Sequence, residues 1–166
     1  NKNANILITQ GFIANNQDKE TVLLGRGGSD TSASYFAIKI AAKRVDIWSD
    51  VPGVFTANPS KIPQAKLLRY LDYDEAQELS AAGAKVIHPQ CIPPLKKFNI
   101  PCCLRWTKVP KVEGTFIGER DITNKDQSLV KAIVTRAKVY LISMESLNMW
   151  QEVGFLEKIF SCFKKH

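Results

Sequence analysis

Short apolar runs alternate with longer amphipathic stretches along the first hundred residues, and this order predicts strands separated by helices. Compact apolar runs of the kind that forms buried strands lie at residues 5–9, 21–24, 45–48, 100–107 and 115–117. Apolar residues recur at helical spacing in residues 31–43 and 72–82, and a further short helix is predicted to begin at residue 88. We therefore expect an α/β fold in which a largely parallel sheet is flanked by helices.

Polar residues and a glycine mark where two of these helices should begin and end. Ser29 or Asp30 is placed to cap the first helix at its N-terminus. Asp72 and Glu75 have the spacing of a capping box for the second helix, and Gly83 is placed to end it.

The pattern changes beyond residue 118. Residues 119–129 are polar and without periodicity, so we expect a linker there. Strand-like runs follow at residues 131–135 and 139–142, and the chain ends on a predicted helix whose apolar stripe consists of Phe155, Leu156, Ile159, Phe160 and Phe163. Because nothing after this helix covers the stripe, we expect a first domain over residues 1–118 and only the beginning of a second domain over residues 130–166.

Composition limits the classes of protein to which the chain can belong. It has 166 residues, 45% hydrophobic and 23% charged, which is typical of a globular domain. No run approaches the roughly 18 apolar residues of a membrane span, and the polar N-terminus gives no support for a secretion signal. The four cysteines lack the spacing of a zinc site, so we expect reduced thiols, no metal and a cytoplasmic location.

The net charge of +7 favours anionic partners. Lysine and arginine total 23 against 16 acidic residues, but the basic residues are scattered rather than grouped. This distribution argues against a nucleic-acid partner and leaves nucleotides and acidic metabolites as candidates.

The glycine-rich turn Gly25-Arg26-Gly27-Gly28-Ser29-Asp30 is the strongest local signal for chemistry. A glycine turn that leads into a helix offers unpaired backbone N–H groups to an anion, and Arg26 adds a fork that suits a carboxylate or phosphate. The same sequence also suits a tight strand–helix turn without a ligand, and Asp30 by itself suits a helix cap. The turn matches neither a Walker A loop nor the dinucleotide-binding fingerprint.

Other candidates are weaker when each is taken alone. Ser49 and Asp50 follow a predicted parallel strand, where α/β folds bind ligands, although a local turn explains them as well. Lys85 is either a phosphate-binding group or an ordinary surface lysine, and His88 is expected to cap the helix that follows. We expect the aromatic residues Trp48, Trp106 and Phe36 to lie in the core.

Five segments, taken in order, resemble aspartate kinase, a member of the amino acid kinase family, over nearly the whole chain. They are Thr-Gln-Gly-Phe at residues 9–12, the segment around the glycine turn at 24–33, and the segments at 47–56, 73–76 and 83–89. Residues 144–150 and 153–156 resemble the start of the regulatory ACT domain of that family. Their sequence is most similar to that of kinases fused to a diaminopimelate decarboxylase.

The resemblance implies ATP-dependent phosphorylation, with Mg²⁺, of the side-chain carboxylate of L-aspartate, the first step towards lysine, threonine and methionine. It implies that Asp30 and Lys85 act in catalysis. Aspartate would be bound by Arg26, Gly27, Gly28 and Ser29, and the nucleotide by Ser49, Asp50, Phe55, Ser60, Lys61, Lys85 and Val86. An amino-acid effector, lysine above all, would bind an ACT-like ferredoxin-type domain at Met149, Gly154, Phe155 and Leu156, and ACT domains would pair in a homo-oligomer.

The chain also departs from the family pattern. The chain has Ser49 where the family usually has threonine, Phe55 where it has tyrosine, and Ser60 where it has a nucleotide-contacting arginine. Whether the neighbouring Lys61 takes over the role of that arginine is left open. The upstream Lys-Phe-Gly-Gly strand of the family is absent, so we expect no turnover by these 166 residues alone. Another amino acid kinase and a non-catalytic amino-acid sensor remain as alternatives.

Overall fold

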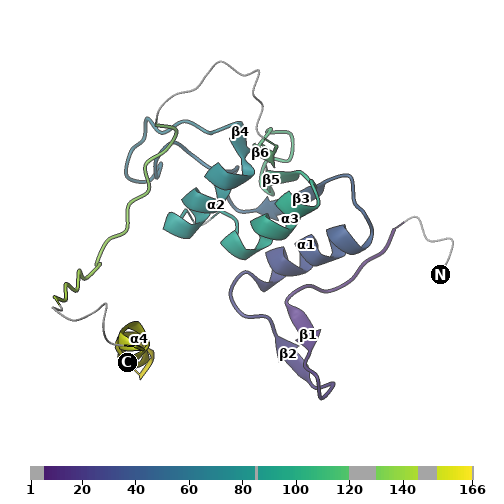
Figure 1. The fold of residues 1–166 in the computed structure, drawn as a ribbon. Helices are drawn as coiled ribbons and strands as arrows, with labels where there is room; N and C mark the ends of the chain where they lie inside the picture. Colours follow the sequence, from purple (N-terminus) through teal and green to yellow (C-terminus); the bar gives the residue numbers. More distant parts are fainter. Residues whose placement is uncertain (1–5, 85, 120–129, 146–152, 166) are drawn as a thin grey trace. The chain divides into compact units, whose positions relative to one another are not determined.

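The computed structural model describes residues 6–84, 86–119, 130–145 and 153–165 (Figure 1). The chain divides into two compact units, Asn1–Arg136 and Ala137–His166. The first unit contains a four-stranded sheet with helices, and the second contains one described helix. The predicted linker at residues 119–129 lies almost wholly outside the described residues, and the predicted domain division stays a prediction.

The main sheet has the strand order β3-β5-β6-β4. Its strands are β3 (Val45–Ser49), β4 (Tyr70–Asp72), β5 (Cys102–Trp106) and β6 (Thr115–Gly118). The pairs β3–β5 and β4–β6 are parallel, whereas β5 and β6 are antiparallel. The expected α/β fold with a parallel-rich sheet is therefore confirmed. The reversal between β5 and β6 puts the C-terminal ends of β3 and β5 at one edge of the sheet and those of β4 and β6 at the other.

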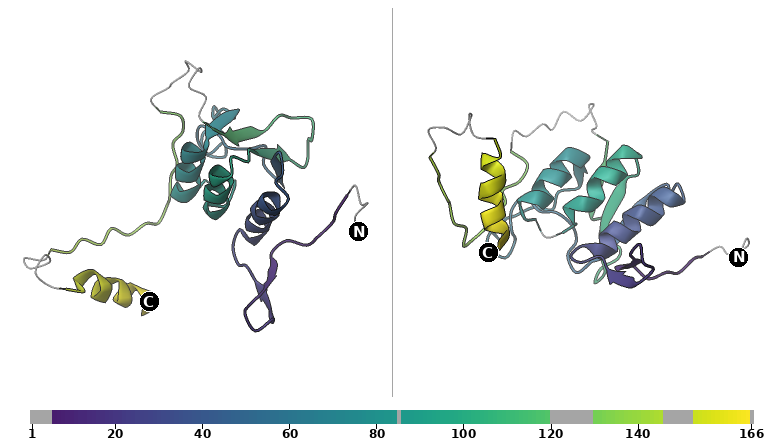
Figure 2. Two further views of the ribbon diagram at one scale, coloured as in Figure 1. Left: turned by 45° about the vertical axis from the view of Figure 1, so that its right-hand side comes forward. Right: turned by 60° about the horizontal axis from the view of Figure 1, so that its bottom comes forward.

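Three helices lie against one face of this sheet (Figure 1, Figure 2). They are α1 (Gly28–Lys39), α2 (Tyr73–Ala82) and α3 (Ile92–Lys97), which follows the 3₁₀ turn η1 (Pro89–Cys91). Between helices and sheet lies a core of side chains that are almost wholly buried, including Leu71, Ile92, Leu95, Leu104 and Ile117.

The opposite face of the sheet is partly exposed. Trp48 of β3 and Phe36 of α1 were both expected in the core, but 48% of Trp48 and 39% of Phe36 are exposed. Trp48 alternates with the buried positions of β3 and so projects away from the helices, with the guanidinium of Arg105 5.9 Å from its ring centre. An aromatic side chain therefore did not identify a core position here.

The predicted ends of α2 are confirmed. The carboxylate of Asp72 accepts a hydrogen bond from the amide of Glu75 (2.8 Å), and the carboxylate of Glu75 accepts one from the amide of Asp72 (2.9 Å). Gly83 ends the helix in the left-handed conformation, with φ of 117°. The guanidinium of Arg136 donates to the carbonyls of Ala81 and Ala82, which the end of the helix leaves unpaired.

Sequence analysis missed two strands, and it predicted three strands that the described residues do not form. Residues 6–9 form no strand, and Ile8 is 92% exposed, because none of the described residues pairs with this run. The missed strands are β4 and β1 (Ile13–Asn15), and β1 forms a hairpin with β2 (Thr21–Leu23). The runs at 131–135 and 139–142 are irregular, although the amide of Ile133 donates to the carbonyl of Thr56 (2.8 Å).

A buried threonine attaches the long loop between β3 and β4 to the sheet. The hydroxyl of Thr115 accepts a hydrogen bond from the amide of Val54 (2.9 Å) and donates one to the carbonyl of Leu68 (2.7 Å). Gly53 lies so close that a Cβ there would be 2.3 Å from the same hydroxyl oxygen. The loop at residues 55–65 is thus anchored on both sides, and Phe55 forms an antiparallel bridge to Leu67.

The second unit contains the predicted C-terminal helix, α4 (Phe155–Lys165). Three side chains of its apolar stripe are half exposed or more: Leu156, Phe160 and Phe163. Among the described residues of the whole chain, no helix is both long enough and apolar enough to cross a bilayer.

All four cysteines are free thiols, as expected. Cys91 and Cys102 are buried in the core, and burial raises the pKa of both thiols, that of Cys91 to about 12. The protonated thiol is thus favoured in the fold and the thiolate in the unfolded chain. The raised pKa therefore contributes fully to the free energy of unfolding below the unfolded pKa of about 8.5, and this contribution is lost as the pH rises towards 12.

We therefore predict selective alkylation by iodoacetamide at pH 8. The native chain should be modified at exposed Cys162, whereas Cys91 and Cys102 should react at least about a hundredfold more slowly because alkylation needs an accessible thiolate. Peptide mass spectrometry over a time course measures the rates. In urea the three thiols should react alike, and equal rates in the native chain would contradict the described core.

Candidate functional site

The glycine turn forms the N-terminal end of α1. Gly25 and Gly27 both have φ of 73°, in the left-handed region that glycine tolerates, and the amide of Gly28 donates to the carbonyl of Gly25 (3.1 Å). The helix begins at Gly28 with Gly27 as its N-cap. The expected cap at Ser29 or Asp30 is therefore wrong, because both residues lie in the first helical turn.

This end of α1 has unpaired donors. Among the described residues, no acceptor is bonded to the backbone amides of Ser29 and Asp30, and the side chain of Arg26 is exposed without an ion pair. Two free amides, the positive end of the helix dipole and a guanidinium in one short segment suit an anionic group.

The side chain of Asp30 joins this turn to a distant segment. Its carboxylate oxygen Oδ2 accepts a hydrogen bond from the backbone amide of His88 (2.9 Å). At the same place Gly27 packs on the imidazole, so closely that a Cβ on Gly27 would be 2.1 Å from His88 Cγ. The glycine turn and the segment around residues 86–88 therefore meet at one place, 58 residues apart in the sequence.

His88 has a second role that sequence analysis did predict. Its ring nitrogen Nδ1 accepts from the amide of Gln90 (3.4 Å), so that the side chain caps η1. Sequence analysis missed its backbone contact with Asp30, and no local pattern could have revealed it. Lys85 lies outside the described residues, while Val86 is half-buried in the segment that leads to His88.

The ends of β3 and β5 hold the Ser49-Asp50 pair in place. The carbonyl of Ser49 accepts from the amide (2.9 Å) and the hydroxyl (2.8 Å) of Thr107, and the carbonyl of Asp50 accepts from the indole N–H of Trp106 (2.9 Å). The hydroxyl of Ser49 is engaged in a local turn with both backbone groups of Val51. The exposed carboxylate of Asp50 has no described partner, which leaves it available to a ligand.

The remaining nucleotide candidates lie in the loop between β3 and β4. Phe55 is half-buried at the base of the loop, whereas Ser60 and Lys61 are exposed in its turn. The amide and hydroxyl of Ser60 both donate to the side chain of Asn58 (3.0 and 2.7 Å), so the hydroxyl is already bonded. No described hydrogen bond or ion pair joins Ser60 or Lys61 to the Asp30–His88 junction.

The candidate effector residues belong to the second unit. Gly154, with φ of 80°, precedes α4, and Phe155 and Leu156 are its first two residues. Met149 lies outside the described residues.

Comparison with known proteins places the chain in a family. Residues 1–105 match the model of the amino acid kinase family. The chain belongs to the amino acid kinase family. Its relatives in this family include the bifunctional aspartokinase/homoserine dehydrogenase of Buchnera aphidicola, which is 39% identical over 98% of this chain and 20% of the relative. The lysine-sensitive aspartokinase 3 of Escherichia coli is 37% identical over 99% of this chain and 36% of that protein.

Solved structures of this family have the same fold. The crystal structure of E. coli aspartokinase III with aspartate and ADP has a TM-score of 0.76 at 34% identity, over 95% of this chain and 34% of that one. The same enzyme with lysine and aspartate has a TM-score of 0.71 over 95% of this chain and 35% of that one. The chain therefore spans about a third or less of the length of the relatives that it matches.

The contact between Gly27 and His88 generates a prediction with a matched control. Gly25 and Gly27 have the same φ, but a Cβ on Gly25 meets nothing within 4 Å. Gly25→Ala should therefore lower the free energy of unfolding by about 1–2 kcal/mol, the cost of a left-handed alanine. Gly27→Ala should lower it by a further 1–3 kcal/mol or so, because the methyl group displaces the His88 ring.

Urea unfolding of the two variants and of the unchanged chain measures both values. Equal losses in the two variants would mean that Gly27 does not pack on His88, whereas a larger loss at Gly27 supports the junction.

Proposed function

We propose that this chain is part of an aspartate kinase, which transfers the γ-phosphoryl group of ATP to the side-chain carboxylate of L-aspartate. The observation that carries the proposal is the junction at which Asp30 accepts from the amide of His88. This hydrogen bond joins the glycine turn, with its unpaired amides, to the segment at His88. The identity of 37–39% to aspartokinases supports the choice among amino acid kinases.

We assign aspartate binding to the glycine turn. Arg26 offers a planar guanidinium, with no described partner, to one of the two carboxylates of aspartate. The backbone of Gly27 and Gly28 and the amide of Ser29 complete the site, where the absence of side chains lets the substrate approach the backbone. Asp30 is itself negative, so its proposed role is to hold the cationic groups of the neighbouring segment in place.

We assign nucleotide binding to the edge at which β3 and β5 end. The free carboxylate of Asp50 is a hydrogen-bond acceptor that suits a ribose hydroxyl, with Ser49 beside it. Phe55 and Val86 offer apolar surface, and Lys85, Ser60 and Lys61 offer donors to phosphates, as the family resemblance implies. The bonds of Ser49 and Ser60 within their own turns weaken the case for these two hydroxyls.

The described residues fit Mg²⁺ only as a companion of the nucleotide. Among them, no group of three or more His, Cys, Asp or Glu side chains is arranged to hold a metal ion. Mg²⁺ is commonly bound through substrate phosphates and one or two carboxylates, and Asp50 is a candidate for such a carboxylate. When bound, the ion would neutralise phosphate charge.

The proposed reaction requires no covalent bond between the protein and the substrates. An oxygen of the ionised aspartate side chain attacks the γ-phosphorus, a new O–P bond forms, and ADP leaves with the electrons of the broken bond. No proton has to be removed from the attacking carboxylate. The chain must align the two anions and neutralise the charge between them, which unpaired amides, Arg26 and Lys85 can do.

We also propose regulation by an amino acid, lysine in the first place, through residues 130–166. The amides at the start of α4, next to Gly154, Phe155 and Leu156, suit an effector carboxylate, and Met149 is assigned to the same site. The E. coli relative carries lysine sensitivity in its name, which supports this choice of effector. The half-exposed apolar stripe of α4 fits pairing of two such domains in a homo-oligomer.

The proposed function predicts a narrow substrate range and a specific effect of Arg26. The complete natural protein should release ADP with L-aspartate and not with L-glutamate or N-acetyl-L-glutamate, and the 166-residue chain alone should release none. Arg26→Ala should raise the KM for aspartate about 10–100-fold, the value of a charge-assisted hydrogen bond, and change the KM for ATP less than about threefold.

Arg44→Ala is the matched control, since Arg44 is an exposed arginine beyond the other end of α1. It should leave both constants unchanged. A coupled assay of ADP release measures these constants. Release of ADP with glutamate but not with aspartate would refute the proposed substrate. An unaltered KM for aspartate in Arg26→Ala would refute the assignment of Arg26.

A further inference from the structure

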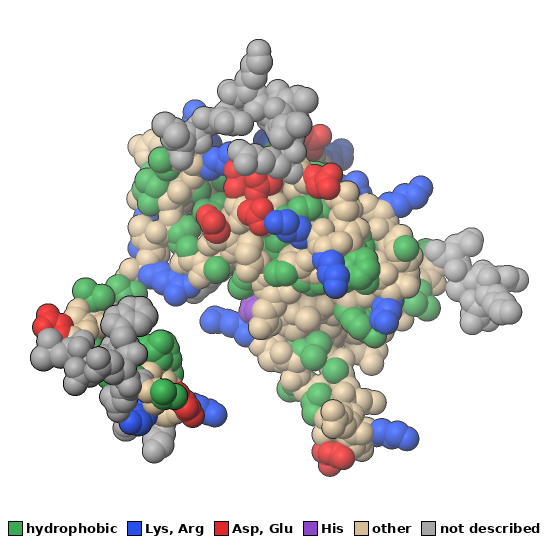
Figure 3. All heavy atoms as spheres, viewed as in Figure 1, with side chains coloured by type: hydrophobic (Ala, Val, Ile, Leu, Met, Phe, Trp, Pro, Cys, Tyr) green, Lys and Arg blue, Asp and Glu red, His purple; other side chains and the backbone are tan. Residues whose placement is uncertain are grey.

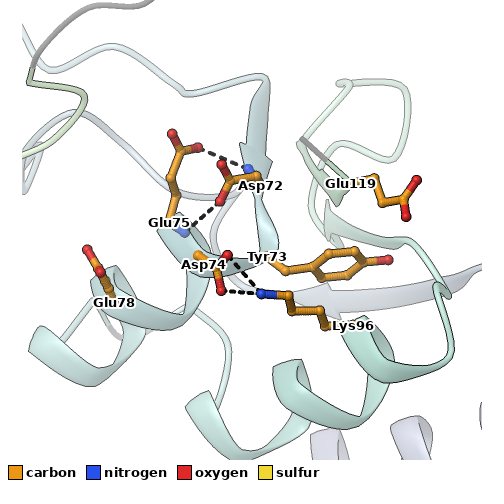
Figure 4. A pocket seen from close by; sticks show the side chains of 7 residues that line it. All are labelled: Asp72, Tyr73, Asp74, Glu75, Glu78, Lys96 and Glu119. Carbon is orange, nitrogen blue, oxygen red and sulfur yellow. Dashed lines mark hydrogen bonds and ion pairs between the residues drawn. The ribbon is translucent and has the colours of Figure 1, made fainter. Parts of the chain in front are cut away.

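A cavity of about 430 Å³ lies at the edge of the sheet opposite the Asp30–His88 junction (Figure 4). Helix α2 runs between these two places, because it begins at the cavity with Tyr73 and ends at Gly83, shortly before His88. The cavity is lined by Asp72, Tyr73, Asp74, Glu75, Glu78, Lys96 and Glu119. It is therefore separate from the proposed aspartate and nucleotide sites.

Negative charge dominates this cavity. Figure 3 shows acidic side chains gathered on one face of the molecule, with few basic ones among them. Three of the five carboxylates already have partners, since Asp72 caps α2, Asp74 pairs with Lys96 (2.6 Å) and Glu75 pairs with Lys131 (2.5 Å).

Two carboxylates remain without a partner among the described residues, those of Glu78 and Glu119. No described hydrogen bond or ion pair involves either of them. In Figure 4 they lie on opposite sides of the cavity, with the ring of Tyr73 between them.

The hydroxyl of Tyr73 points independently to a ligand. The side chain is only 3% exposed, yet its oxygen has no hydrogen-bond partner in the described part of the chain. In Figure 4 the ring extends across the cavity towards Glu119. A buried hydroxyl without a partner destabilises a fold unless something in the cavity bonds to it. Burial, with Glu119 nearby, raises the pKa of Tyr73 to about 12, so at neutral pH the group is an uncharged donor and acceptor.

The carboxylates do not converge on a point as ligands of a metal ion would. None of the described acidic groups belongs to a cluster of three that could hold a metal, and three of the five here are engaged elsewhere. Two separated carboxylates without partners suit an elongated cation that carries a charge at each end.

We propose that this cavity binds an aliphatic diamine or polyamine. One ammonium group donates to Glu119 and to the hydroxyl of Tyr73, a second ammonium group donates to Glu78, and the methylene chain spans the cavity between them. Both ends of the ligand are charged and both carboxylates are used. A monoamine or a single inorganic cation pairs with only one of the two carboxylates.

Calorimetric titration of the 166-residue chain with 1,4-diaminobutane tests the proposal. We expect saturable binding with a dissociation constant of about 1 mM or lower, and binding of n-butylamine at least about tenfold weaker. Tyr73→Phe removes one oxygen atom and should weaken diamine binding about tenfold, and Glu119→Gln should weaken it by at least as much.

Two control variants keep the test specific. Tyr35→Phe removes a hydroxyl from an exposed tyrosine of α1, and Glu20→Gln removes a charge from the β1–β2 turn, and neither should alter binding. If Tyr73→Phe does not fold, Glu119→Gln carries the test, since Glu119 is exposed.

Absence of saturable diamine binding, equal affinity for n-butylamine, equal affinity for Mg²⁺ as its chloride, or unchanged affinity in Glu119→Gln would each overturn the proposal. Because these titrations involve neither aspartate nor ATP, their outcome is independent of the proposed kinase function.

Discussion

The hydrogen bond from the backbone amide of His88 to the carboxylate of Asp30 determines how the candidate site is assembled. It fixes the start of α1 against the segment after α2, while the ring of His88 occupies the space that Gly27 leaves open. Two different constraints therefore act at one place: a polar bond that needs a carboxylate and a close contact that needs a glycine. Together they align the free amides of α1 with a segment that the chain reaches only after 58 further residues.

The sheet supplies the frame for this junction. Because β5 and β6 run in opposite directions, α1 and α2 approach the sheet from opposite edges. The beginning of α1 and the end of α2 consequently lie at the edge where β3 ends with Ser49, and the beginning of α2 lies at the other edge. This geometry separates an edge with unpaired donors, suited to anions, from an edge rich in carboxylates, suited to cations. The hydroxyl of Thr115 stabilises the first edge by anchoring the long loop between β3 and β4.

Sequence analysis succeeded where the determining interactions are local. The capping box of Asp72 and Glu75 spans three residues, so its pattern is visible in the sequence. Residues 6–9 have an apolar pattern equally typical of a strand, but a strand needs a hydrogen-bonding partner, and none is present among the described residues. The predicted N-cap of α1 was wrong, because the carboxylate of Asp30 accepts a hydrogen bond from His88 and not from an amide of its own helix. The direction of β6 and the exposure of Trp48 depend on tertiary arrangement, which local patterns do not encode. The composition of the glycine turn predicts an anion site, and that stays a prediction, whereas the junction of the turn with His88 became visible only in the structure.

In the proposed function, the glycine turn and the segment before His88 form one site for the anionic substrates. Amide NMR of the 166-residue chain during titration with ADP in the presence of L-aspartate tests it most directly. For one shared site, we expect the amide signals of Ser29 and Asp30 in one segment, and of Val86 and His88 in the other, to shift along a single saturation curve. Shifts confined to one of the two segments, or two curves with different midpoints, would contradict it.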